Sequence, residues 1–191
     1  MVNFIAIDFE TANRSDESIC AAGMAIFTHG RLLDGQHWLI RPPRGFDRFR
    51  SDWTKSLHGI GPADVQNSPY FPGIAELLFP QLALADVVIA HNAAFDLRKL
   101  LATARCFNLV VPQFDCLCTL ALARRVWPDL EGHSLDVLCA HIGHRGHHHH
   151  AGADAEAAGR LLLAMMATTN TATPRALAKK LGIQPRPVPG R

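Results

Sequence analysis

The sequence predicts an α/β domain built on a mixed sheet, and three observations support this fold class. Apolar, β-branched segments at 2–9, 19–28 and 31–40 follow one another closely, as in an antiparallel meander. A continuous apolar run at 85–91 precedes an amphipathic helix at 94–105, which is typical of a buried parallel strand and its crossover. A chain of 191 residues with 48% hydrophobic composition suits one compact domain.

The first third of the chain is expected to form three strands. Because side chains alternate faces along a strand, Asp8 and Glu10 should point the same way at the end of the first strand. His29 and Gly30 stand between the second and third strands and predict a hairpin turn. Residues 41–70 are rich in Pro, Gly, Arg and Asp, so we expect a long surface excursion with one short helix.

Helices and strands alternate in the rest of the chain. A helix is expected at 73–84, and Pro80 within it should kink or divide it. A fifth strand is expected near 110–115, followed by a helix at 116–126. Three further helices are expected at 135–142, at 151–167 and between Pro174 and Gly182, before an extended or disordered tail at 184–191.

Charge divides the chain into two parts. Residues 171–191 hold five basic side chains and no acid, which leaves 14 basic against 17 acidic residues in 1–170. We therefore expect one domain at 1–170 and a basic, proline-containing C-terminal helix and tail at 171–191. The tail either contacts phosphates or is a solvated end. The mildly acidic domain argues against tight, nonspecific DNA binding.

No segment indicates membrane insertion or secretion. The apolar runs are shorter than the roughly 20 residues of a membrane span, and the first residues lack a basic region before the apolar stretch. We expect a cytoplasmic protein with no membrane partner.

Four acids and one histidine indicate the chemistry. Asp8 and Glu10 lie in the segment DFET, Asp96 ends the segment HNAAFD, and His149 and Asp154 lie in HHAGADA. Carboxylates gathered without basic partners repel one another, so a fold that gathers them usually does so around divalent metal. A neighbouring histidine can take a proton near neutral pH. This combination predicts two-metal hydrolysis of a phosphodiester.

Each of these residues receives an expected role. Two Mg²⁺ or Mn²⁺ ions roughly 3.5–4 Å apart would activate the water, neutralise the phosphate and stabilise the leaving 3′-oxygen. Asp8 is the candidate bridging ligand, and Asp154 would complete the water-activating metal. Glu10 and Asp96 would be metal ligands, or hydrogen-bond acceptors next to the ligands of the two ions. His149, expected on a loop or first helical turn, would be the general base.

Simpler interpretations stand beside these. Asp8 and Glu10 are also what a solvated strand end looks like, and Asp154 is also an acid favoured by the positive end of a helix. His148 or His150 is an alternative to His149 as the base. The remaining alternative is a zinc site that uses Cys139, His141 and His144, which lack a standard ligand spacing.

The motifs resemble those of the DEDD exonucleases, in particular the histidine-containing branch (DEDDh), which includes the proofreading subunit of bacterial DNA polymerase III and ribonuclease T. IDFETA at 7–12 resembles the first motif of that family, HNAAFD at 91–96 the second, and His149-x4-Asp154 the third. LHGI at 57–60 resembles a stretch between the first two. The three motifs stand in the family's order over residues 4–160. Any single match is weak evidence, whereas all three in order are strong evidence.

The resemblance implies a ribonuclease H-like fold, with a mixed five-stranded sheet flanked by helices. It also implies release of nucleoside 5′-monophosphates, one at a time, from single-stranded or frayed 3′ ends. In such enzymes the backbone after the first motif meets the terminal nucleotide, where this chain has Thr11 and Ala12. Asn92, Phe95 and His58 are further substrate-side candidates, although Asn92 could equally be a helix cap.

The sequence leaves the substrate and partners open. DNA is the expected substrate, and an RNA-trimming exonuclease is the alternative, since nothing in the sequence indicates recognition of a 2′-hydroxyl. A module that binds 3′ ends without cutting is a third interpretation. A homodimer, or a replication or repair protein that binds this chain, is a further expectation.

Overall fold

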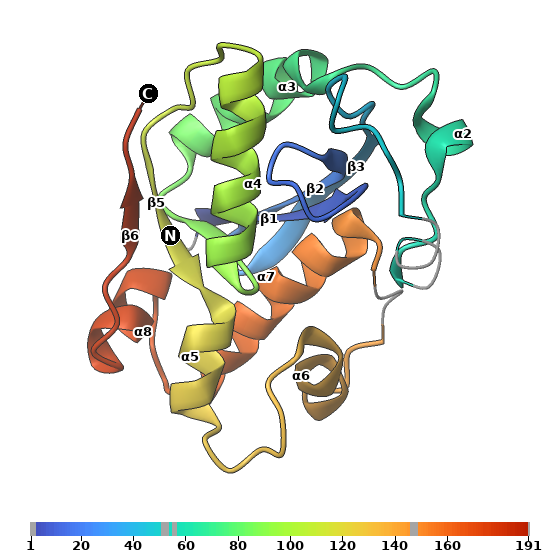
Figure 1. The fold of residues 1–191 in the computed structure, drawn as a ribbon. Helices are drawn as coiled ribbons and strands as arrows, with labels where there is room; N and C mark the ends of the chain where they lie inside the picture. Colours follow the sequence, from blue (N-terminus) through green and yellow to red (C-terminus); the bar gives the residue numbers. More distant parts are fainter. Residues whose placement is uncertain (1–2, 51–53, 55–56, 146–148, 191) are drawn as a thin grey trace.

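The computed structural model describes residues 3–50, 54, 57–145 and 149–190. Its centre is a mixed sheet of six strands in the order β3-β2-β1-β4-β5-β6 (Figure 1). The predicted α/β class with a mixed sheet flanked by helices is confirmed. The predicted count of five strands is wrong by one.

The antiparallel meander is confirmed. β1 (Asn3–Thr11) pairs antiparallel with β2 (Ile19–Thr28), and β2 pairs antiparallel with β3 (Arg31–Leu39). His29 and Gly30 form the turn between β2 and β3, both with positive φ, 52° and 74°. Such a pair matches the twist of a two-residue hairpin.

Two parallel strands follow the meander. β4 (Val88–Ala90) pairs parallel with β1, and β5 (Phe114–Cys118) pairs parallel with β4. The fifth strand was expected near 110–115, but β5 begins four residues later, at Phe114. The next helix begins at Thr119 rather than at 116. The physical reason is Pro112, which has no N–H to donate to the ladder of a central strand.

The sixth strand comes from the C-terminal segment. β6 (Arg186–Val188) pairs antiparallel with β5 at the edge of the sheet. Pro187 is tolerated there because an edge strand has one unpaired side, and Val188 is buried against the core. Arg175 also ties this segment to the sheet, since its Nη2 donates to the Asp115 carboxylate at 2.9 Å. The tail at 184–191 was expected to be extended or disordered, and its residues Arg186–Val188 are extended, as strand β6.

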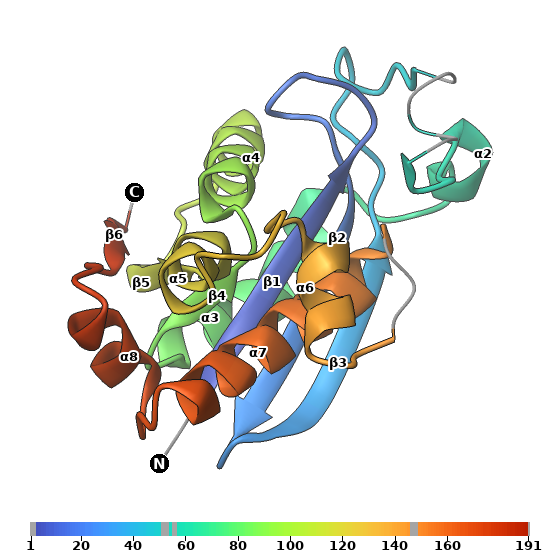
Figure 2. The same cartoon turned by 90° about the horizontal axis from the view of Figure 1, so that it is seen from below.

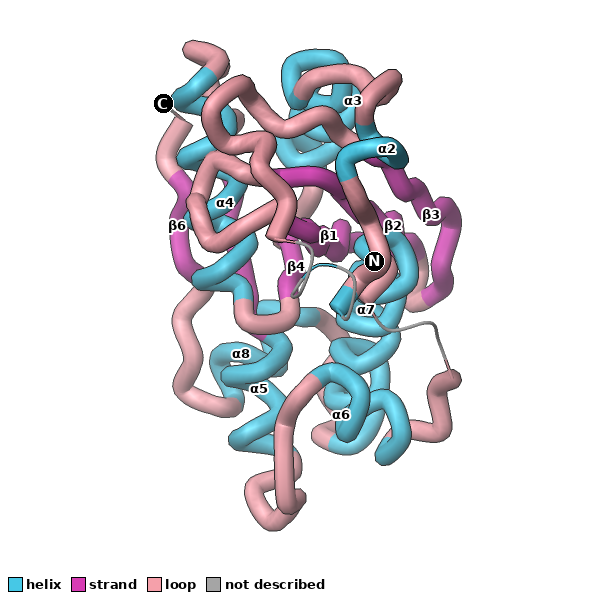
Figure 3. The backbone as a smooth tube through the Cα atoms, turned by 45° about the vertical axis from the view of Figure 1, so that its right-hand side comes forward, coloured by secondary structure: helices cyan, strands magenta, loops and turns pink. Residues whose placement is uncertain are grey.

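Helices cover both faces of the sheet, as Figures 2 and 3 show from two directions. α3 (Phe71–Leu84) and α4 (Ala93–Cys106) pack on one face, and α3 continues through Pro80 without division. The other face carries α5 (Thr119–Val126), α6 (Leu135–His141), α7 (Ala151–Thr168) and α8 (Pro174–Lys180), while the short α2 (Pro62–Val65) lies in the long connection after β3. Among these helices, and elsewhere in the described ranges, none is long and apolar enough to cross a bilayer.

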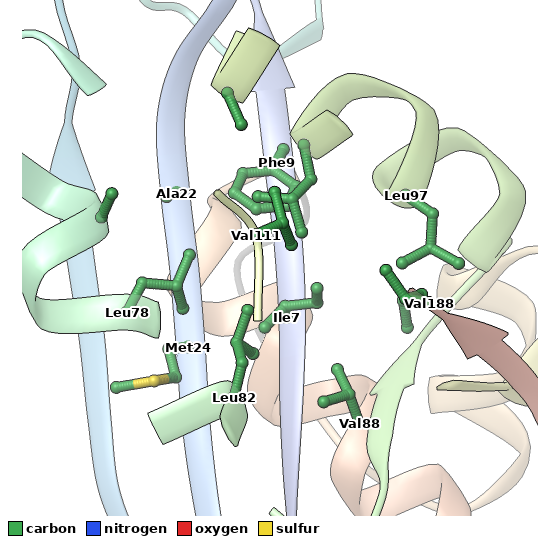
Figure 4. Packing of buried hydrophobic residues seen from close by; sticks show 14 of the residues in the cluster. Ile7, Phe9, Ala22, Met24, Leu78, Leu82, Val88, Leu97, Val111 and Val188 are labelled. Carbon is green, nitrogen blue, oxygen red and sulfur yellow. The ribbon is translucent and has the colours of Figure 1, made fainter. Parts of the chain in front are cut away.

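β1 separates two cores by the alternation of its side chains. Ile7 and Phe9 pack with α3 and α4, together with Leu78 and Leu97 (Figure 4). The alternate positions, beginning with Phe4, face α7 instead. The same alternation therefore carries the later acids of the strand toward the start of α7.

α7 lies directly on the sheet at its first turn. A Cβ built on Gly23 of β2 would overlap the carbonyl group of Ala151, and one built on Gly159 would overlap the ring of Phe27. These close approaches require glycine. They bring the N-terminal end of α7 beside the end of β1, where the predicted catalytic residues gather.

Gly23→Ala should therefore destabilise the protein. The added methyl meets backbone atoms that cannot rotate away, so the free energy of unfolding should fall by about 1–3 kcal/mol. Gly35→Ala is the matched control, because nothing lies within 4 Å of a Cβ at that position of β3. Urea unfolding of both variants measures the difference. Equal stability of the two variants would contradict this packing of α7.

Candidate active site

The predicted residues gather at a cavity of about 470 Å³ at the carboxyl ends of β1 and β4. Such ends are where sheets with parallel strands commonly form sites. Seven predicted residues contribute to the wall, and six further residues complete it. The wall consists of Asp8, Phe9, Glu10, Thr11, Leu57, His91, Asn92, Phe95, Ser134, Leu135, Asp136, His149 and Asp154.

Glu10, Asp154 and His149 form the tightest group in this cavity. One carboxylate oxygen from each acid and one imidazole nitrogen all lie within 4.8 Å of one another. Glu10 comes from the end of β1 and Asp154 from the first turn of α7, and their side chains are only 7% and 6% exposed. Asp154 thus lies on the core-facing side of α7, although its place in the first turn also fits an acid favoured by the positive end of the helix.

Asp96 is not among the residues that line the cavity. It occupies the first turn of α4 and is 1% exposed. Its Oδ1 accepts a hydrogen bond from the Phe9 N–H at 3.2 Å, which ties α4 to β1 beside Asp8. Its Oδ2 is buried and has no hydrogen-bond partner among the described residues. A buried carboxylate oxygen without a partner is costly unless another group binds it.

The electrostatics of the cluster show that these carboxylates repel one another. Burial, together with Asp96, Glu10 and Asp154, raises the pKa of Asp8 well above its ordinary value. Burial and the charges of Asp154 and Asp96 raise the pKa of Glu10 to about 8. Burial also raises the pKa of Asp96 to about 8, although backbone N–H groups oppose the shift. Glu10 is buried and Asp8 half-buried, so neither has the exposure of a fully solvated strand-end acid.

The residues present fit divalent metal ions. Among the described residues, no lysine or arginine forms an ion pair with Asp8, Glu10 or Asp96. Carboxylate oxygens are the ligands that Mg²⁺ and Mn²⁺ prefer, and the unpartnered Oδ2 of Asp96 is such an oxygen. Bound cations would reverse the local charge that raises these pKa values.

His149 occupies a distinctive backbone position just before α7. Its φ is 64°, in the left-handed region that non-glycine residues rarely adopt. Its backbone N–H donates to Asp154 Oδ2 at 2.8 Å, so the turn is tied to the acid of the same motif. Its exposed side chain lines the cavity, as the predicted loop position requires.

The alternative histidines differ from His149. The structure places the His150 ring against His37 of β3, with a centroid distance of 3.8 Å. His148 lies outside the described residues. The zinc ligands considered above do not converge, because the described residues of that region contain no group of three donors. His141 instead packs edge-on against Trp127, at 4.9 Å between ring centroids.

The backbone after the first motif is held by His58. The Ile60 N–H donates to His58 Nδ1 at 3.1 Å, so the neutral ring carries its proton on Nε2 and donates it to the Thr11 carbonyl at 3.2 Å. Burial lowers the pKa of His58, which favours this neutral form. Ala12 is fully buried, and its backbone N–H donates to the Ser18 carbonyl at 2.8 Å. Neither Ala12 nor His58 lines the cavity.

Asn92 and Phe95 both line the cavity. Asn92 is the N-cap residue of α4, with a φ of 61°, but its side chain makes no capping hydrogen bond. Phe95 is half-buried, and Lys99 Nζ lies 5.1 Å from its ring centroid. Lys99 is 2% exposed and donates to the Ser15 carbonyl and to Asp16 Oδ1 at 2.9 and 2.8 Å. This buried cation, which the sequence did not single out, joins the Phe95 ring to the loop after β1.

Several wall residues are also missing from the predicted set. His91 directly precedes Asn92, and its Nε2–H donates to the His133 carbonyl at 3.1 Å while its Nδ1 lies 3.0 Å from Thr119 Oγ1. Burial lowers its pKa to about 4, so it is a neutral structural ring. Leu57, Ser134, Leu135 and Asp136 complete the opposite wall. Three of the missed wall residues lie in segments that the sequence singled out: Phe9 in IDFETA, Leu57 in LHGI and His91 in HNAAFD.

Comparison with known proteins is consistent with this geometry. A family model described as "Exonuclease" (RNase_T) matches residues 5–162. The chain is 28% identical over 167 residues to the "3'-5' exonuclease DinG" of Bacillus subtilis, covering 85% of this chain and 17% of that protein. It is 43% identical over 131 residues to a putative bifunctional exonuclease/endonuclease of Mycobacterium tuberculosis, covering 64% and 20%. The chain thus spans about a fifth or less of these relatives.

Solved structures of nucleases are similar over nearly the whole chain. Exonuclease X in complex with 5′ overhanging duplex DNA superposes with a TM-score of 0.72 at 25% identity, covering 94% of this chain and 99% of that one. The nuclease domain of 3'hExo, a DEDDh family member bound to rAMP, has a TM-score of 0.72 at 15% identity, covering 99% and 97%. This second likeness concerns the fold.

The raised pKa values predict that the metal-free protein loses stability as pH rises. The unfolded chain releases the protons of Glu10 and Asp96 near the ordinary values of 4.5 and 3.8, whereas the folded chain keeps them to about pH 8. The folded state therefore binds more protons in this window, so the free energy of unfolding should fall from about pH 4.5 to about 8. Mn²⁺ should restore stability most strongly at the upper end, because it binds the ionised carboxylates.

Urea midpoints in chelator and in Mn²⁺, measured near pH 5 and pH 8, test this expectation. Glu10→Gln should flatten the profile, and Asp34→Asn, on the exposed side of β3, is the matched control that should leave it unchanged. A wild-type midpoint in chelator that stayed level or increased with pH would contradict the pKa assignment.

Proposed function

Because this chain belongs to the exonuclease family whose model matches residues 5–162, we propose that it is a metal-dependent 3′–5′ exonuclease acting on single-stranded or frayed DNA ends. The observation that carries the proposal is the cavity in which Glu10, Asp154 and His149 lie within 4.8 Å of one another, beside Asp8. Cleavage would release nucleoside 5′-monophosphates one at a time.

The four carboxylates are the proposed metal ligands. Asp8, Glu10, Asp96 and Asp154 would hold two Mg²⁺ or Mn²⁺ ions. When bound, such a pair supplies charge neutralisation for the phosphate and lowers the pKa of water. The unpartnered Oδ2 of Asp96 supports its inclusion in the set, although Asp96 does not line the cavity.

His149 is the proposed general base. Its exposed ring at the cavity wall lies within reach of a water placed beside Glu10 and Asp154. It would take a proton from that water as the water attacks the phosphorus. The hydrogen bond from its backbone to Asp154 fixes the distance between the base and a metal ligand.

The proposed nucleotide contacts come from the cavity wall and from the backbone after the first motif. Thr11 and Ala12 supply the backbone after the first motif, and His58 acts on it indirectly by donating to the Thr11 carbonyl. Phe95 offers a half-buried ring on which a base could stack, a sequence-tolerant contact. Asn92 is exposed beside it, and its side chain makes no cap bond, which favours substrate contact over capping.

Two comparisons support DNA as the substrate. The structure of exonuclease X with duplex DNA is 25% identical to this chain, whereas that of 3'hExo with rAMP is 15% identical. The second comparison is with the PolC-type DNA polymerase III of Caldanaerobacter subterraneus, which is 29% identical over 168 residues and is a DNA polymerase by its name. RNA trimming is the alternative outcome of the assay below.

The purified protein should release mononucleotides from a 3′-labelled DNA oligomer in Mg²⁺ or Mn²⁺, and Asp8→Ala should abolish release. Asp34→Asn is the control, since that acid is exposed on β3. A parallel RNA oligomer of the same sequence compares kcat/KM for the two substrates. If neither is degraded, or if Asp8→Ala degrades them at the wild-type rate, the proposed function fails.

His149→Ala should reduce kcat by about two to four orders of magnitude, the usual contribution of a general base. Mn²⁺ affinity should largely survive, because the four carboxylates remain. Calorimetric titration of Mn²⁺ alongside the kinetic assay separates the two effects. Loss of Mn²⁺ binding in this variant would identify the histidine as a metal ligand instead.

A further inference from the structure

The turn at His149 needs a support outside the motif. Its left-handed backbone is strained for a histidine, and such a conformation persists only when neighbouring contacts fix it. The bond from the His149 N–H to Asp154 is one such contact. The further contacts around the first turn of α7 come from its N-cap residue and from β3, a strand far away in the sequence.

Two imidazoles hold the first turn of α7. His150 is the N-cap, and its Nδ1 accepts from the Ala153 N–H at 3.3 Å. His37 of β3 accepts at its own Nδ1 from the Gly152 N–H, also at 3.3 Å. The two rings stack with centroids 3.8 Å apart and planes 23° apart. The residue that follows His149 is thereby fixed to the sheet.

The start of α7 packs closely against β3 beside the stack, although the His150 side chain is itself exposed. A Cβ at Gly152 would lie 3.0 Å from the Cβ of His37 and 3.2 Å from the Gln36 carbonyl oxygen, so the helix start sits close against β3. Gly23 allows the same close approach on β2. His150 follows His149 directly, so a single peptide bond connects the stacked ring to the left-handed turn.

The hydrogen bonds orient the two rings toward the start of the helix. Each Nδ1 accepts a backbone N–H, so its lone pair is directed at the first turn of α7. Burial and the neighbouring His150 lower the pKa of His37, which favours the neutral form that can accept.

We infer that the stacked pair of His37 and His150 is a positioning device for His149. It holds the left-handed turn so that the His149 ring faces the carboxylate cluster. This inference rests on the proposed role of His149 as the base. It predicts that kcat depends on a histidine of an edge strand that does not line the active-site cavity.

The test compares kcat and KM on the 3′-labelled oligomer in Mn²⁺. His37→Ala should lower kcat about ten- to a hundredfold with KM nearly unchanged, as expected when a reacting group is misplaced by about 1 Å. His37→Phe keeps the stack and should recover most of kcat. His150→Asn keeps a capping acceptor but loses the stack, so it should fold normally and still lose kcat. His144→Ala, in the same connection before α7, is the control.

Thermal unfolding and Mn²⁺ titration of each variant show that folding and metal binding are intact. If His37→Ala and His150→Asn both keep wild-type kcat while His149→Ala loses it, the positioning role is overturned and the role of His149 stands. Equal losses in His37→Ala and His37→Phe would also overturn it, because stacking would then have no effect. If His149→Ala keeps wild-type kcat, the proposed role of His149 as the base is wrong. The positioning role of His37 and His150 is then wrong as well, because it rests on that base.

Discussion

Mutual repulsion among buried carboxylates is the constraint on which the rest of this structure depends. Asp8, Glu10, Asp96 and Asp154 come from one strand and two helices. Asp8 is half-buried and the other three are buried, and no lysine or arginine among the described residues pairs with Asp8, Glu10 or Asp96. Holding such a group costs free energy that must come from elsewhere in the fold. The surrounding core supplies it, and bound cations would remove most of the repulsion.

The topology explains how so few residues assemble the site. β1 is a central strand that pairs with β4 at Ile5 and Ala6, and its later part, with the two acids, stays paired with β2. α4 approaches from one face and α7 from the other, and each contributes an acid from its first turn. The left-handed turn before α7 then places an exposed histidine next to the buried acids. Acids held by packed elements beside one exposed ring are the arrangement that the proposed function requires.

Much of this arrangement could be predicted because the signals are local. Alternation along β1 puts Asp8 and Glu10 on one face, and the helical phase of Asp154 with Leu161 and Met165 puts that acid inward. Asp96 follows the buried strand β4 by only a few residues, which places it near the carboxyl end of that strand. Each of these inferences needs only the period of one element.

Other features depend on contacts between distant segments, which local patterns do not contain. β6 pairs with β5 across some 70 residues, and Pro112 shifts the start of β5 past the apolar residues that suggested it. Lys99 looks like a solvated helix lysine until Asp16 and the Phe95 ring are found against it. His150 resembles its neighbour in sequence, and its stacking on β3 distinguishes the two.

The most direct test of the central claim is the number of Mn²⁺ ions that the cluster binds. Calorimetry or electron paramagnetic resonance, with a nucleoside 5′-monophosphate present, should give two ions for each wild-type chain and fewer for Asp8→Asn. Binding that is absent from the wild-type chain, or unchanged by Asp8→Asn, would contradict the account of these carboxylates as a metal site.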